Sequence, residues 1–70
     1  MGTSYAFTDE RGDRATSKAA RFIRDVRETL NRRAAIVGTV QDKRSNKWRC
    51  VVDICGAKDV RIDQIARKYK

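Results

Sequence analysis

The sequence predicts an α+β fold: an N-terminal amphipathic helix packed on a small antiparallel β-sheet of two or three strands, with a short helical segment at the C-terminus. Three patterns predict it. Residues 14–33 repeat apolar side chains with a helical period. Two short β-branched runs, 34–40 and 48–54, flank a polar stretch. Residues 59–69 then return to a mixed apolar pattern.

The expected helix at 14–33 has one apolar stripe and one charged face. Gly12 releases the chain before it, and Asp13 is placed to cap it. The charged face offers ion pairs at i,i+4 spacing, each worth a few tenths of a kcal/mol. The stripe is Ala15, Ala19, Phe22, Ile23, Val26 and Leu30, and the expected pairs are Arg21–Asp25, Arg24–Glu28 and Glu28–Arg32.

The two β-branched runs predict a hairpin. Asp, Ser and Asn in the polar stretch 41–46 favour a turn. Gly38, inside the first run, indicates a bulge or a close approach by another backbone. One face of the second run carries Trp48, Cys50, Val52 and Ile54, and we expect this face to meet the apolar stripe of the helix.

The two ends of the chain leave alternatives open. Residues 1–13 predict an N-terminal arm or a short strand, and residues 14–70 a single small α+β domain. Residues 59–62 fit a short strand followed by a helical turn or two. The spacing of Ile62, Ile65, Ala66 and Tyr69 also fits a helix.

Net charge is the strongest functional signal. Seventeen Lys and Arg against nine Asp and Glu give +8, with a pI near 10.2. Such a surplus on a small domain is typical of nucleic-acid binders, because its field concentrates phosphate polyanions. Arginine is equally an interface residue for protein partners. Charge therefore favours nucleic acid, and leaves a protein partner open.

The stretch "QDKRSNKWRC" supplies the candidate site. A basic hairpin can lie along a phosphate backbone or enter a groove as a two-stranded ribbon. Trp48 either stacks on an unpaired base or anchors the core, and its alternation with Cys50 favours the core. The expected contacts are Lys43, Arg44, Lys47 and Arg49, with Arg32 and Arg33 nearby and Arg61, Arg67 and Lys68 as secondary contacts.

Catalytic chemistry is not indicated. The chain has no histidine, and its four glycines are isolated, so neither the commonest general base nor a glycine-rich phosphate loop is present. We expect no enzyme, no catalytic or metal-binding residues and no cofactor. Cys50 and Cys55 read as two small buried hydrophobes in a reducing, cytoplasmic compartment. No stretch is long and apolar enough to cross a membrane.

Two functional hypotheses follow. The first is a small non-enzymatic nucleic-acid-binding protein, DNA slightly favoured over RNA, acting through Arg and Lys contacts to phosphate. The second is a protein-interaction module, such as a phage or mobile-element inhibitor or adaptor that docks on a larger protein. A chain of 70 residues has a small core. A homodimer, in which a second copy adds buried area, therefore stays open as well.

Overall fold

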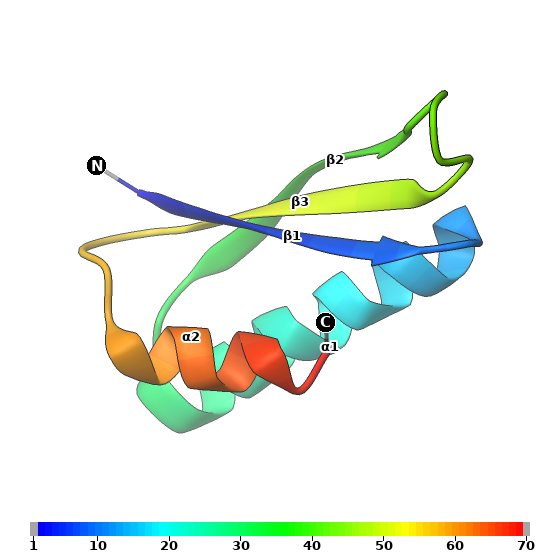
Figure 1. Ribbon diagram of the computed structural model, residues 1–70. Coiled ribbons are helices and arrows are strands. Elements are labelled where there is room, and N and C mark those ends of the chain that lie inside the picture. The colour runs from blue at the N-terminus through cyan, green and yellow to red at the C-terminus, as the bar shows by residue number, and fades with distance from the viewer. Residues whose placement is uncertain (1, 70) are drawn as a thin grey trace.

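The α+β class is confirmed by a computed structural model, which describes residues 2–69 (Figure 1). Three strands form one antiparallel sheet in the order β1-β3-β2. A strand comes first in the chain, so the long helix connects β1 to β2 instead of starting the fold. In chain order the elements are β1 (Thr3–Asp9), α1 (Gly12–Leu30), β2 (Ala34–Gln41), β3 (Trp48–Ile54) and α2 (Val60–Arg67).

Helix α1 begins and ends earlier than the sequence pattern indicated. Arg11 is the N-cap, with extended backbone and no side-chain cap, and Asp13 lies in the first turn. The prediction that Asp13 caps the helix is therefore wrong, although its carboxylate still lies near the positive end of the helix dipole. Asn31 ends the helix in the left-handed conformation (φ 53°), and its N–H donates to the Arg27 carbonyl at 3.0 Å.

The apolar stripe of α1 packs on the sheet as predicted. Ala15, Ala19, Phe22 and Val26 are fully buried. The Phe22 ring lies between two aromatic rings of β1, with centroids 5.3 Å from Tyr5 and 4.8 Å from Phe7. Cys50, Val52 and Ile54 of β3 complete this core.

The predicted hairpin is formed by β2 and β3. The register shifts between Ile36 and Gly38, so Val37 is an extra residue in β2. A Cβ placed on Gly38 would meet no atom within 4 Å, so of the two interpretations of Gly38 the bulge is right and a close backbone approach is wrong.

The last segment is a helix, and the expected strand at 59–62 is wrong. Asp59 caps α2 by accepting a hydrogen bond from the Arg61 N–H at 2.9 Å. Ile62, Ile65 and Ala66 are buried on its inner face. The alternation of residues 60–63 resembled a strand, but the cap and the i, i+3, i+4 spacing decided the outcome.

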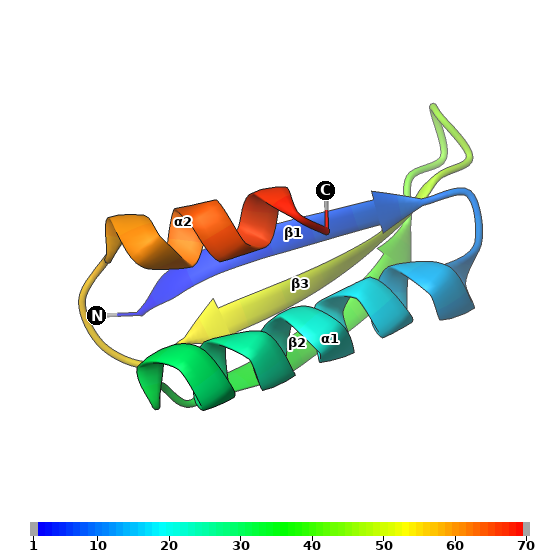
Figure 2. The ribbon, with the colours of Figure 1, turned by 90° about the horizontal axis from the view of Figure 1, so that it is seen from below.

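Both helices cover the same face of the sheet, and the other face carries no helix (Figures 1 and 2). The hairpin that joins β2 to β3 lies at the end of the sheet where β1 passes into α1 (Figure 1).

Within residues 2–69, neither helix is apolar enough over a sufficient length to cross a membrane. Cys50 is buried as expected, but Cys55 is exposed, because β3 ends at Ile54 and the chain turns away from the core.

Candidate nucleic-acid interface

The loop between β2 and β3 has a defined shape. The Asp42 N–H donates to the Lys47 carbonyl, and the Asn46 N–H donates to the Asp42 carbonyl, each at 2.8 Å. Asn46 takes the left-handed conformation (φ 60°) that the tight return requires. An Asp42 side-chain oxygen accepts from the Arg44 N–H at 3.0 Å. The acid of this loop is therefore engaged in holding the turn.

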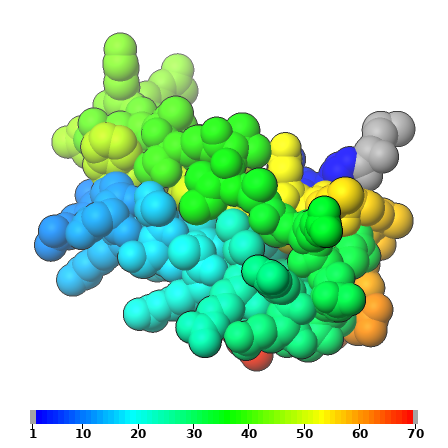
Figure 3. All heavy atoms as spheres, turned by 180° about the vertical axis from the view of Figure 1, so that it is seen from behind, coloured from blue at the N-terminus to red at the C-terminus, as the bar shows by residue number. Residues whose placement is uncertain are grey.

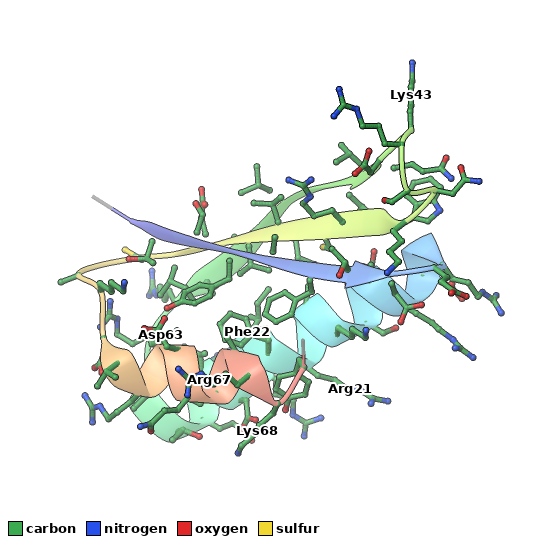
Figure 4. The ribbon with its side chains drawn as sticks, viewed as in Figure 1. Arg21, Phe22, Lys43, Asp63, Arg67 and Lys68 are labelled. Carbon is green, nitrogen blue, oxygen red and sulfur yellow. The ribbon has the colours of Figure 1, made fainter. Side chains whose placement is uncertain are left out.

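Lys43 and Arg44 extend from the tip of this loop. Both are exposed, and neither forms an ion pair with a carboxylate of residues 2–69. Figure 4 shows Lys43 pointing away from the body of the protein, on the side of the sheet that the helices leave bare. Lys43 and Arg44 therefore present two positive charges to solvent from a hydrogen-bonded turn.

Arg49 and Lys47 flank the tip on different sides. Arg49 is exposed on β3, and its cross-strand neighbours, Thr8 and Val40, are both neutral. Lys47 leans toward the β1–α1 turn, where it lines a shallow hollow with Glu10 among others. The hairpin end therefore brings together four of the predicted contacts, with Arg49 extending the positive surface onto the bare face of the sheet.

Arg32, which we expected beside the hairpin, lies at the opposite end of the sheet. β2 starts two residues after Arg32 and runs from there to the hairpin. The longest dimension of the molecule is 34 Å. The Arg32 guanidinium donates to the Cys55 carbonyl at 2.9 and 3.1 Å and to the Ala57 carbonyl at 2.7 Å. Its hydrogen bonds hold the β3–α2 connection. Arg33 is exposed next to it, at the start of β2.

Arg61 is also engaged. Its guanidinium contacts the Asp59 carboxylate at 2.7 Å. Hydrogen bonds from the side chain and N–H of Arg61 lower the pKa of Asp59 to about 2, and the same carboxylate raises the pKa of Arg61. This pair stabilises the start of α2 and leaves Arg61 less available to a phosphate.

Arg67 and Lys68 lie on the helical layer, at the end of α2, and both are exposed. Figure 4 shows them on the opposite side of the molecule from Lys43. Arg21 of α1 lies on the same layer and lines a hollow with Tyr69, the residue after Lys68. We expected Arg21 to pair with Asp25 and so did not name it as a contact, but among residues 2–69 it forms no ion pair.

Only one of the three expected i,i+4 ion pairs of α1 forms. Arg24 contacts Glu28 at 3.1 Å. Asp25 instead accepts a hydrogen bond from the Tyr69 hydroxyl at 2.6 Å, and Arg32 lies beyond the helix end. The predictions for Arg21–Asp25 and Glu28–Arg32 are wrong, because tertiary partners took one member of each pair. Helical spacing alone carries no signal for such partners.

Trp48 belongs to the core side of the sheet. It is half-buried and packs against the core cluster. A Cβ on Gly12 would lie only 3.0 Å from the Trp48 ring, so the indole covers the first turn of α1. The other four aromatic residues, Tyr5, Phe7, Phe22 and Tyr69, also lie in or against this core. The exposed surface of residues 2–69 therefore offers no aromatic platform.

Comparison of the chain with models of protein families, with curated proteins and with solved structures finds no match.

Proposed function

We propose that this chain binds a double-stranded nucleic acid, DNA before RNA, through phosphate contacts made by the β2–β3 hairpin. The observation that carries the proposal is the pair Lys43 and Arg44. Both are exposed on a turn that Asp42 holds in shape, without an ion-pair partner among residues 2–69. Arg49 and Lys47 widen the contact.

The overall charge supports this. The four ion pairs formed by the described residues engage only Arg11, Lys18, Arg24 and Arg61. Several carboxylates serve neutral partners instead: Asp25 and Asp63 accept from tyrosine hydroxyls, and Asp53 accepts from Ser4. Each ion pair cancels one positive and one negative charge, so the net charge of +8 remains in full to attract a polyanion.

The burial of the aromatic side chains favours a duplex over a single strand. Binding of single strands without sequence preference relies on bases stacking on exposed aromatic rings. Here the rings lie in or against the core. Contacts to phosphate do not need them, and a two-stranded ribbon fits the major groove of B-DNA.

A salt titration of duplex binding tests the proposal, using two variants that each lose one lysine and one arginine. Lys43→Ala/Arg44→Ala removes the hairpin charges, and Arg67→Ala/Lys68→Ala removes the same charge from the helical layer. We expect the hairpin variant to lower the slope of log K against log salt by about 2, since each phosphate contact contributes about 0.9. The control should change it less. Equal effects would show that affinity follows total charge and that the hairpin is not the site.

A second candidate function is a protein-interaction module, and a different surface favours it. Of the four large hydrophobic side chains that are exposed among residues 2–69, three lie on β2. A pull-down that survives nuclease and moderate salt would support this function over the first. For either function, two free thiols fit a reducing compartment such as the cytoplasm.

A further inference from the structure

The outer edge of β2 has few of the features that protect an edge strand. β2 lies at the edge of the sheet, and its eight residues, "AAIVGTVQ", include no charged residue and no proline. Ile36, Val37 and Val40 are 40%, 63% and 58% exposed. Edge strands of this kind present free N–H and C=O groups to another strand, and proteins usually block them with charges or prolines.

The opposite edge of the sheet is protected in that way. The Lys18 ammonium donates to the Thr8 carbonyl of β1 at 2.9 Å and contacts the Asp9 carboxylate at 3.0 Å. A charged side chain therefore sits against the end of β1. On β2 the bulge at Val37 is the protective feature, and it occupies one residue of the strand.

The flank of α1 beside β2 is uncharged near Thr39 and basic near the start of β2. Thr16 contacts Thr39 of β2 through their hydroxyls at 3.1 Å. Ala20, one turn further on, is exposed. Ile23 lines a hollow with Ala34 at the start of β2, and Arg27, Arg32 and Arg33 line the same hollow. Figure 3 shows this side of the molecule, with β2 (green) lying along α1 (cyan). A partner strand on β2 would also cover this flank.

We propose that β2 pairs with β2 of a second copy of this chain, antiparallel across a two-fold axis, to give one continuous six-stranded sheet. An axis at the middle of the strand, between Val37 and Gly38, places the bulge at the axis and sets Ala34 opposite Gln41, Ala35 opposite Val40 and Ile36 opposite Thr39. The same register places Arg33 of one copy beside Asp42 of the other, at both ends of the pairing. One pair of opposite charges thus lies at each end of an uncharged strand and favours this register. The same register sets Arg32 opposite Lys43, but the Arg32 guanidinium is bonded to the Cys55 and Ala57 carbonyls.

The two-fold arrangement bears on the proposed function, and this step rests on that function. From the axis to the hairpin tip is about six residues, or roughly 20 Å at a rise of about 3.3 Å per residue. The two tips would lie roughly 40 Å apart, close to one turn of B-DNA at about 34–36 Å. The dimer could then contact one duplex with both hairpins.

Sedimentation equilibrium of the full chain tests the pairing. Moderate salt, about 0.15 M, screens the repulsion between two chains of charge +8. Val37→Lys is the test variant, and Val60→Lys on α2 is the matched control, because the two valines are 63% and 66% exposed. We expect wild type and Val60→Lys to form dimers, and Val37→Lys to raise the dimer dissociation constant at least about tenfold, since it sets like charges against each other. A monomeric wild type, or equal behaviour of the two variants, would overturn the pairing.

Charge reversal tests the register. Arg33→Asp should weaken the dimer, and Arg33→Asp/Asp42→Lys should restore it even though the second change removes a loop contact. Failure of the double variant to recover would overturn this register. Duplexes of 10 and 20 base pairs then separate the two proposals. Wild type should prefer the longer duplex more strongly than Val37→Lys does, whereas a dimer that binds neither duplex refutes the nucleic-acid function and leaves the pairing intact.

Discussion

The Tyr5 hydroxyl of β1 donates a hydrogen bond to the Asp63 carboxylate of α2, and this contact joins the first strand of the chain to its last helix. A second tyrosine completes the attachment: Tyr69, just beyond α2, donates to Asp25 of α1 at 2.6 Å. α2 has only eight residues, and a helix of that length is marginal by itself in water. Its position therefore depends on these two contacts and on Ile62, Ile65 and Ala66.

The Tyr5 contact predicts a loss of stability at high pH. Burial of the ring, and then the hydrogen bond to Asp63, raise the pKa of Tyr5 from 10.0 to about 12. Below pH 10 the hydroxyl is protonated in both states, so its contribution is fully present. Above pH 10 the unfolded chain loses the proton first, so the free energy of unfolding falls as pH rises from 10 toward 12.

Tyr5→Phe isolates this effect. We expect the variant to be less stable at neutral pH by about 1 kcal/mol, for the lost hydrogen bond. The gap between the two proteins should then narrow between pH 10 and 12. Urea unfolding at each pH measures it, with Tyr69→Phe as the control for the second tyrosine. A constant gap across that range would contradict the assignment.

Asp59 gives a prediction at the acid end. Because hydrogen bonds from Arg61 lower the pKa of Asp59 from 3.8 to about 2, its contribution is present above 3.8 and is lost as pH falls through about 2. Asp59→Ala should lower the thermal midpoint at pH 7, whereas Asp59→Asn, which keeps a cap acceptor, should lower it less. The difference between Asp59→Ala and wild type should shrink as pH falls from about 4 through about 2. A difference that stays constant over that range would contradict this role.

The fold was predictable where a single face decides the structure. The spacing of Ala15, Phe22 and Val26 fits only a helix, and the alternation of Cys50 and Val52 fits only a strand. Each pattern correctly predicted which face of its element is buried. The pattern of residues 59–62 fits both a strand and a helix, and only the N-cap at Asp59 distinguishes the two. The pairing of β1 with β3 joins residues 39 to 51 positions apart, and local pattern carries no information on it.

The candidate site was predictable only in part, for a similar reason. Lys43, Arg44 and Lys47 are neighbours in sequence, so any hairpin keeps them together. We expected Arg32 near them, but its partners are the carbonyls of Cys55 and Ala57, which the fold brings to it from a distant part of the chain. Long-range hydrogen bonds of this kind leave no mark on charge spacing.

Phe22 should be the most sensitive position of α1. It is fully buried and contacts both aromatic rings of β1, whereas Leu30 is only half-buried at the end of the helix. Truncation of a buried phenylalanine costs about 3–5 kcal/mol, a large part of the total stability of a small domain. We expect Phe22→Ala to be largely unfolded by circular dichroism at 25 °C and Leu30→Ala to remain folded. Equal losses would mean that the core does not centre on Phe22.

Trp48 should act as a structural residue and not as a base-stacking one. Its indole covers Gly12 at the start of α1, and stacking on a base would require it to leave that contact. We therefore expect its emission to change little when an oligothymidine is added, and Trp48→Phe, which keeps a ring over Gly12, to bind duplex DNA with an affinity within about twofold of wild type. Stacking contributes about 1–3 kcal/mol per base. A stacked Trp48 would therefore give strong quenching, and its replacement by alanine would lower the affinity more than about fivefold.

Trp48→Ala is less stable for packing reasons alone, so its binding should be measured at a temperature where circular dichroism shows it folded. Quenching of the Trp48 emission by the single strand, together with tighter binding to the single strand than to a duplex, would contradict this prediction. Recognition would then rest on base stacking and not on phosphate contacts.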